Sequence, residues 1–256
     1  METTGNRAES IEIFAVPAIP EDSAGADLTV LVCQAMEQHD LEFCDGDILV
    51  VAQKIVSKSE GRLVELRTVD PSPFAFSVAT ANCKDPRVVE VVLRESSRIV
   101  RMDGSVLIVE TRQGFICANA GVDSSNVPQG WVSLLPVDSD ASADRLRDGV
   151  QAGTGRSVAV VITDTFGRPW REGLTNVALG VSGLAPLEDY HGQTDPHGQT
   201  LYATVVATAD ELAAAAGLLM GKTARQPVIV IRNYRFTAKQ GKGTALIRPP
   251  EKDLFR

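Results

Sequence analysis

Short runs of apolar residues, rich in β-branched types, recur along the chain, and polar residues, Gly or Pro bound each run. Runs of this length are typical of buried strands, because an ordinary helix needs about ten residues or more. The sequence therefore predicts four buried strands, which span residues 11–16, 48–52, 158–162 and 228–232.

Between these runs, the apolar positions follow the spacing of amphipathic helices. Asp27 and Asp85 suit N-caps, and Pro86 fits a first helical turn. The expected helices span 28–38, 85–97, 139–153 and 208–220, a hairpin is expected over 105–110 and 114–118, and 176–182 and 201–208 are strand-like. Because strands and helices alternate irregularly, we expect an α+β fold with mixed or antiparallel sheets and flanking helices.

The strand at 158–162 leads directly into Thr163-Asp164-Thr165, before Gly167 and Pro169 break regular structure. We therefore expect Asp164 and Thr165 at the mouth of the strand, where their oxygens suit Mg²⁺ or Mn²⁺. Arg168 follows closely, and arginine pairs well with phosphate. This combination favours a site for phosphoryl chemistry.

A second acidic loop, GFICANAGVDSSNVPQG over residues 114–130, places Asp123 and Asn126 three positions apart. Asn, Asp, Ser and Gly are also the usual residues of turns, so an ordinary Asx-type turn explains this loop equally well when it is taken alone. Together with Asp164, the loop favours a site that holds both metal and phosphate.

Two further stretches carry polar residues next to predicted elements. Gln53, Lys54 and Lys58 follow the strand at 48–52, either as phosphate contacts or as a solvated face. Gly221-Lys222 resembles the end of a P-loop, but Ala216 stands where the first Gly of that motif belongs, and the pair follows a helix. It is therefore not a P-loop, although its loop can still contact a phosphate.

Composition excludes several classes of protein. The 256 residues carry a net charge of −8, which argues against a nucleic-acid groove. No window approaches the roughly 18 apolar residues of a membrane span, and the polar N-terminus lacks the apolar core of a signal peptide. We expect a cytoplasmic protein with a disordered lead over 1–10 and one domain over 11–256, in which residues 138–153 are best suited to an internal hinge.

These stretches together resemble the coenzyme F420:L-glutamate ligase (F420-0:γ-glutamyl ligase) family, in its order and spacing. The motifs are GDILVVAQKIVSKSEGR, NAGVDSSNVPQG, VITDTFGRPWREG, ADELAAAAGLLMGK and LIRPPEKDLF. The likeness is greatest to the bacterial ligase domain, without its fused flavin-reductase-like domain. It implies an F420 ligase-like fold, an intertwined homodimer, and GTP-dependent addition of L-glutamate to coenzyme F420-0, with Mg²⁺ or Mn²⁺ (one or two ions) and K⁺.

The resemblance also implies roles for single residues. Asp123 and Asp164 match the ligands of one divalent metal, and Thr165 matches a ligand of a second. Asp123, Asp164 and Arg168 are the expected catalytic residues. Lys222 stands where archaeal members place an acidic ligand, which puts the second metal site in question. The expected nucleotide contacts are Val16, Pro17, Ala18, Ile19, Gln53, Lys58, Asn126, Gly221 and Lys222.

An amide ligase must first activate a carboxylate, because a carboxylate is a poor acyl donor. Phosphoryl transfer from GTP would produce an acyl phosphate, which the amine of glutamate then attacks. Two alternatives use the same residues: a metal-dependent phosphohydrolase, and a protein that binds a nucleotide or deazaflavin without turnover.

Overall fold

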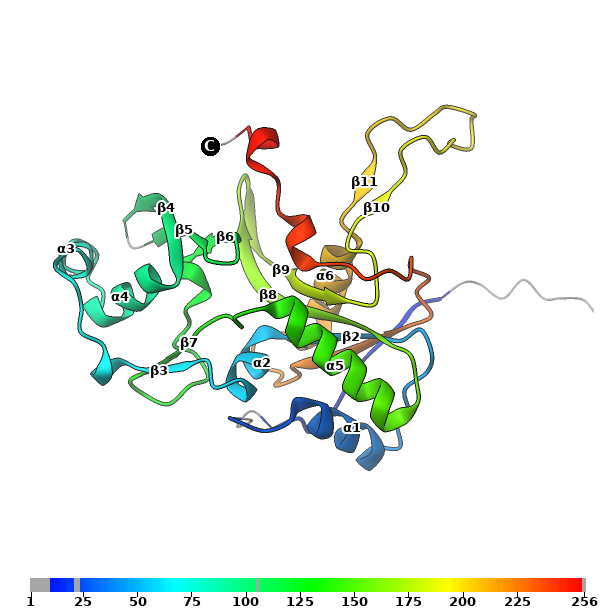
Figure 1. The fold of residues 1–256 in the computed structure, drawn as a ribbon, viewed down its shortest axis with the longest axis horizontal. Helices are drawn as coiled ribbons and strands as arrows, with labels where there is room; N and C mark the ends of the chain where they lie inside the picture. Colours follow the sequence, from blue (N-terminus) through cyan, green and yellow to red (C-terminus); the bar gives the residue numbers. More distant parts are fainter. Residues whose placement is uncertain (1–9, 21–23, 105, 255–256) are drawn as a thin grey trace, which may run out of the picture.

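A five-stranded mixed sheet forms the centre of the protein (Figure 1). The computed structural model describes residues 10–20, 24–104 and 106–254. The strands lie in the order β1-β12-β2-β8-β9, and β2 pairs with β8 in parallel while the other neighbours are antiparallel. Their bounds are β1 Glu12–Ala15, β2 Ile48–Ala52, β8 Ala159–Arg168, β9 Arg171–Ser182 and β12 Val228–Arg232. The α+β class and all four predicted strands are confirmed, although β1 at the edge of the sheet is only partly buried.

Both faces of this sheet are buried, which explains the continuous apolar runs. Within β2, Leu49 and Val51 point into one core, while Ile48 and Val50 point into the other. The first core lies under α1 (Leu28–Gln38), α2 (Gln53–Ser59) and α5 (Ser139–Thr154). The second lies under α6 (Thr208–Met220). Figure 1 shows α1, α2 and α5 on the side of the sheet opposite α6.

In the sequence, a separate lobe is inserted between the parallel strands β2 and β8. It lies at the left of Figure 1. It has small apolar cores of its own, around Val89 and Leu107 and around Leu66 and Val132. Its elements are β3 Leu63–Glu65, η1 Leu66–Thr68, α3 Pro73–Asn82, α4 Pro86–Arg94, β4 Ser96–Asp103, β5 Val106–Thr111, β6 Ile116–Ala118, η2 Asn119–Gly121 and β7 Trp131–Ser133. The chain then returns to the sheet through α5.

The expected end of the third buried strand is wrong. β8 does not stop at Ile162 but continues to Arg168, because β9 pairs with it antiparallel around a turn at Pro169-Trp170. Its parallel neighbour β2 does stop, at the Ala52–Thr163 pair. Asp164 and Thr165 therefore lie inside a strand, just past the end of β2.

Other differences are local. Residues 53–59 form helix α2, and α3 and β4 were not expected. In the strand-like stretch 201–208, only β11 (Val205–Val206) is extended, paired with β10 (Glu188–Asp189). These two strands form the base of an arm that projects at the upper right of Figure 1. The remaining 3-10 turns are η3 Gly243–Leu246 and η4 Pro250–Lys252. The helices at 28–38 and 208–220 and the hairpin of β5 and β6 are confirmed.

The expected hinge at 138–153 corresponds to α5, a continuous helix packed on β8, β9 and α1. The hinge stays a prediction, and nearly all of the expected disordered lead lies outside the described residues. No helix of the described residues is long and apolar enough to cross a membrane.

Carboxylates hold the outer edge of the sheet. β9 is an edge strand, whose outward N–H groups have no strand partner. Asp140 of α5 accepts the N–H of Val181 (2.9 Å), and Asp210 of α6 accepts the N–H of Ala178 (2.8 Å). Burial raises the pKa of both acids. These bonds fix β9 two residues from Asn176, which faces the site described next.

Candidate active site

A cavity of about 380 Å³ opens where β2 ends and β8 continues. We call it the sheet cavity. The loop after α6 forms one wall, and the first turn of α2 forms another. Its polar lining residues are Gln53, Lys54, Lys58, Asn126, Asp164, Thr165, Asn176, Lys222, Thr223, Arg225 and Gln226. Seven positions that the sequence predicted therefore come together here, namely Gln53, Lys58, Asn126, Asp164, Thr165, Gly221 and Lys222.

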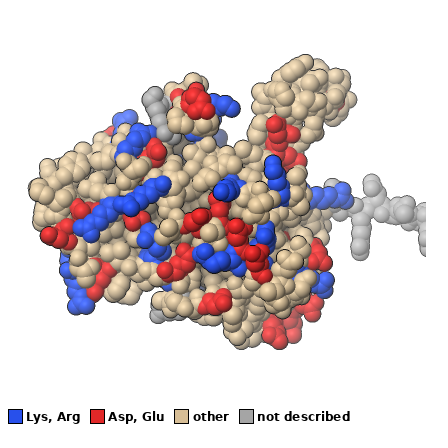
Figure 2. Space-filling view, in the orientation of Figure 1, with Lys and Arg blue, Asp and Glu red and all other residues tan. Residues whose placement is uncertain are grey.

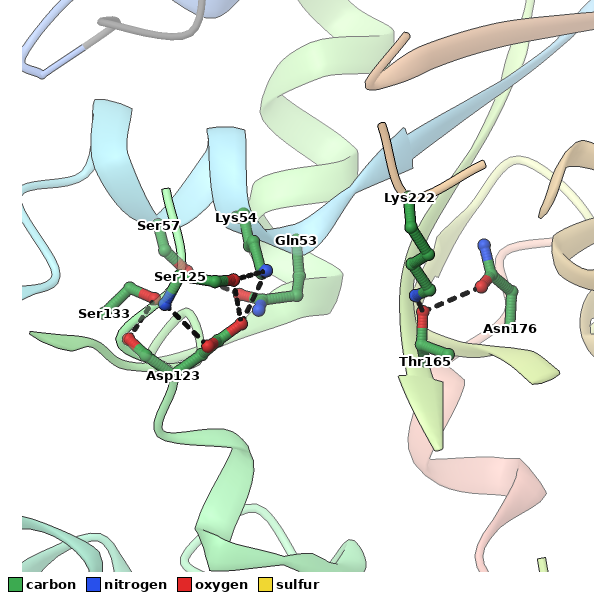
Figure 3. Close-up of polar contacts among 9 residues, drawn as sticks. All are labelled: Gln53, Lys54, Ser57, Asp123, Ser125, Ser133, Thr165, Asn176 and Lys222. Atoms are coloured by element: carbon green, nitrogen blue, oxygen red, sulfur yellow. Dashed lines mark hydrogen bonds and ion pairs between the residues drawn. The ribbon is translucent and has the colours of Figure 1, made fainter. Parts of the chain in front are cut away.

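One polar cluster joins the start of α2 to the lobe (Figure 3). Lys54 Nζ lies 2.5 Å from Asp123 Oδ2 and donates to Ser125 Oγ at 2.6 Å. Asp123 also accepts from the backbone N–H and the hydroxyl of Ser125, each at 2.8 Å. Backbone bonds with Ser133 hold Asp123 in place from the other side. Asp123 is thus fixed at the boundary between the sheet and the lobe.

A second polar cluster joins the loop after α6 to the hairpin of β8 and β9. Lys222 Nζ donates to Thr165 Oγ1 at 2.6 Å, and this hydroxyl donates to Asn176 Oδ1 at 2.9 Å (Figure 3). Thr165 and Asn176 face each other because they are register partners. Lys222 therefore directs its charge into the cavity.

The two acids differ in electrostatic setting. Burial raises the pKa of Asp123, but hydrogen bonds from Lys54 and Ser125 outweigh this and hold it below its usual value. Burial raises the pKa of Asp164 to about 6, and the charge of Asp123 adds to this rise. The Thr165 N–H and the charges of Lys54 and Lys222 oppose it without cancelling it. The positive charge around Asp164 is therefore too small to offset the cost of burying its ionised carboxylate.

The residues fit a hard divalent cation. Two interacting carboxylates and a threonine hydroxyl are oxygen donors, and ammonium groups already contact Asp123 and Thr165 where cations would bind. Among the described residues, no group of three or more His, Cys, Asp or Glu converges on one point. Mg²⁺ commonly keeps several water and phosphate ligands, so a set of two carboxylates is enough.

Comparison with known proteins agrees with this geometry. The model of the F420-0:γ-glutamyl ligase family matches residues 18–233. The chain belongs to this family. It is 45% identical over 249 residues to the coenzyme F420:L-glutamate ligase of Methanothermobacter thermautotrophicus, covering 96% of this chain and 99% of that protein. Proteins of the same name from Methanopyrus kandleri and Methanocaldococcus jannaschii are 43% and 42% identical, covering 96% and 87% of this chain and 98% and 89% of theirs.

Arg168, which was predicted as a site residue, lies outside the sheet cavity of this family member. Arg168 is exposed at the outer end of the hairpin, where its guanidinium donates to the Glu172 carbonyl at 3.2 Å. The strand was expected to end at Ile162, but it continues past Asp164 and carries Arg168 four residues beyond that acid, or about 13 Å along an extended chain. Arg168 is not part of the sheet cavity.

The segment Val16-Pro17-Ala18-Ile19 also lies outside the cavity lining. Val16 and Ile19 are buried in the core beneath α1, and the N–H of Val16 bonds to the Val228 carbonyl at 2.9 Å. A contact between this segment of the family member and a nucleotide stays a prediction.

Asn176 and Ser125 were missed as site residues, and Lys54 was undervalued relative to Lys58. The signal for Lys54 was present, because it directly follows Gln53 at the end of a buried strand. No local pattern marks Asn176, since its position depends on the register between β8 and β9. Lys58 lines the cavity as predicted and is only 8% exposed.

Proposed function

We propose that the protein ligates L-glutamate to the deazaflavin coenzyme F420-0 at the expense of GTP, and then extends the product through γ-linkages. The observation that carries the proposal is the sheet cavity, where Asp164, Lys54 and Lys222 surround a space of about 380 Å³ beside Asp123. This is the charge pattern that phosphoryl transfer requires, namely cations for the phosphates and carboxylates for a divalent metal.

The reaction divides into two steps. A carboxylate oxygen of F420-0 attacks the γ-phosphorus of GTP, so that GDP leaves and an acyl phosphate forms. The amine of glutamate then attacks the acyl carbon, which releases inorganic phosphate and forms the amide. Lys58 and Lys222 neutralise the phosphate oxygens as charge moves toward GDP, and the burial of Lys58 strengthens its contact.

Asp123 and Asp164 would hold Mg²⁺ or Mn²⁺, and a bound ion would supply positive charge against the negative charge that develops on the phosphate. For this ion to bind, Lys54 must give up part of its contact with Asp123. Lys222 takes the place of a second cation at Thr165, because its ammonium already contacts that hydroxyl. We expect K⁺ to increase the activity, as the family resemblance implies.

We also propose that the protein is a homodimer. Large apolar side chains are exposed on two projecting segments: Trp170 (85% exposed) on the β8–β9 hairpin and Tyr202 (75% exposed) on the arm. Figure 2 shows that the arm carries no lysine or arginine on the side in view, and its sequence over 187–206 contains none. Exposed apolar surface of this kind marks interaction sites. Light scattering should report twice the 27.4 kDa mass of one chain, whereas a monomer at micromolar concentration contradicts this proposal.

Glutamate-dependent release of GDP tests the catalytic proposal. Purified protein is incubated with GTP, Mn²⁺ and F420-0, with and without L-glutamate. A ligase releases GDP at a sustained rate only when both F420-0 and glutamate are present. Equal rates without glutamate would indicate a phosphohydrolase, and no release under any condition would indicate a binding protein.

A further inference from the structure

A second cavity, of about 310 Å³, lies within the lobe on the other side of Asp123. We call it the lobe cavity. Asp123 and Ser124 line its rim, so it begins where the polar cluster of Lys54 ends. Lys84, Asp85 and Asn119 also line it. Its apolar wall consists of Val88, Val89, Val92, Leu107, Val122 and Val132. A concave space with an apolar wall and a few polar groups is typical of a site for an organic ligand.

Lys84 is the cation of the lobe cavity. Its ammonium donates to Asn119 Oδ1 at 3.1 Å, and no carboxylate of the described residues pairs with it. The adjacent Asp85 instead binds Arg87, with 2.6 Å between Oδ2 and Nη2. Burial lowers the pKa of Lys84, as expected for a cation that lacks an opposite charge. An anionic group on a ligand would supply this missing partner.

The backbone between Lys84 and Asp123 is held in an unusual conformation. Asn119, Ala120 and Gly121 all have positive φ, at 52°, 54° and 68°. This conformation is unfavourable for Ala120, whereas Asn119 tolerates it, and a Cβ at Gly121 would lie 2.7 Å from the Leu135 side chain. The strained turn aims Asn119 at Lys84 and leads on to Asp123. The two polar ends of the lobe cavity are therefore fixed relative to each other.

We propose that the lobe cavity binds the acceptor substrate, a planar heteroaromatic molecule with an anionic tail. This inference rests on the proposed function, in which the acceptor is F420-0. The deazaflavin ring packs on the wall around Val88 and Leu107, and the phosphodiester pairs with Lys84. The terminal carboxylate then passes Asp123 into the sheet cavity, where GTP supplies the phosphoryl group. L-Glutamate does not fit this wall, because it is small and carries charges at both ends.

Direct binding tests the inference without requiring turnover. The full chain is titrated with F420-0 in the presence of Mg²⁺ and a non-hydrolysable GTP analogue, and the deazaflavin fluorescence reports the dissociation constant. Lys84→Met removes the charge and should weaken F420-0 binding by about tenfold to a hundredfold, because a charge-assisted bond is lost. Val88→Phe fills the cavity from a half-buried position and should weaken binding at least about tenfold.

The affinity for the GTP analogue should not change in either variant, which shows that the sheet cavity is intact. Lys252→Met removes an exposed charge near the C-terminus and should bind F420-0 like the wild type. If the wild type transfers glutamate and both cavity variants keep its dissociation constant for F420-0, the inference is wrong and the proposed function stands. An increase in the Michaelis constant for glutamate alone would also overturn it. If the wild type binds F420-0 through Lys84 but transfers no glutamate, only the proposed function fails.

Discussion

The two acids of the candidate active site come from regions of opposite character. Asp164 belongs to the central sheet, in the longest-paired part of the structure, and burial raises its pKa to about 6. Asp123 belongs to the inserted lobe, and Lys54 and Ser125 satisfy it so well that its pKa lies below the usual value. Asp123 of the lobe thus already has a cationic partner, Lys54, whereas Asp164 of the sheet still needs one.

This difference indicates that the two acids have different roles in the site. A group in an unfavourable setting persists when a ligand compensates for it, so Asp164 is the stronger candidate for a metal contact. Asp123 instead lines the lobe cavity and pairs with Lys54 of the sheet cavity, which aligns the lobe with the sheet. Each prediction below changes one side of this comparison.

The largest effect is expected from Asp164→Asn. Loss of the charged oxygen should lower the ligation rate by at least about a hundredfold, because metal-assisted charge stabilisation contributes several kcal/mol. The melting temperature without metal should stay equal or rise, since the ionised carboxylate is disfavoured where it lies. Asp123→Asn is the matched control, and it should lower both the rate and the melting temperature. A rate for Asp164→Asn within a few fold of wild type would refute its role.

Metal binding should distinguish the wild type from Asp164→Asn. Mn²⁺ at about a hundred times its dissociation constant should stabilise the wild type by about 2.7 kcal/mol against unfolding, through mass action. Asp164→Asn should show little of this gain. Thermal melts with and without EDTA provide the measurement. An equal shift in both proteins would show that the ion binds elsewhere.

Substitutions of Lys222 test the sheet cavity alone. Lys222→Ala should raise the Michaelis constant for GTP about tenfold or more, because a contact between ammonium and phosphate is worth roughly 1.5–3 kcal/mol. The constant for glutamate should hardly change. In Lys222→Glu, the new acid faces Thr165 and should bind a second metal ion, which restores part of the lost activity. Unchanged GTP kinetics in Lys222→Ala would show that Lys222 is only a solvated residue.

The smallest effect concerns the junction between lobe and sheet. Lys54→Met removes the ion pair with Asp123, whose two side chains are 31% and 36% exposed. Pairs this exposed contribute about 1 kcal/mol or less, so the melting temperature should fall by only a few degrees. Thermal melts measure the fall in melting temperature, and chemical denaturation measures the loss of unfolding free energy. Lys239→Met is a control at an exposed position. A much larger loss would mean that this pair holds the lobe in place.

The central sheet could be predicted because burial on both faces leaves a plain signal in sequence. The runs at 48–52 and 228–232 could hardly form anything but buried strands, and Gln53 and Lys54 directly after the first run line the cavity. The position of Asp164 within a longer strand was missed, because pairing with β9 overrode the breaking tendency of Gly167, and the strand ends only before Pro169. Helix α3 was missed because its apolar residues show no clear helical face.

The lobe cavity also escaped prediction from sequence. Its wall combines valines of α4 with Leu107 of β5 and Val132 of β7, which are brought together only by tertiary packing. Lys84 carries no motif, and its lack of an acidic partner is visible only in three dimensions.

The most direct test of the central claim is the mass of the coenzyme after reaction. F420-0 is incubated with GTP, Mn²⁺ and L-glutamate, together with either the wild type or Asp164→Asn, and the products are analysed by mass spectrometry. The account predicts that the wild type converts F420-0 to species heavier by one or more glutamyl groups, only when GTP and glutamate are both present, and that Asp164→Asn leaves F420-0 unchanged. An unchanged mass with a folded wild type, under conditions in which GTP is consumed, would contradict it.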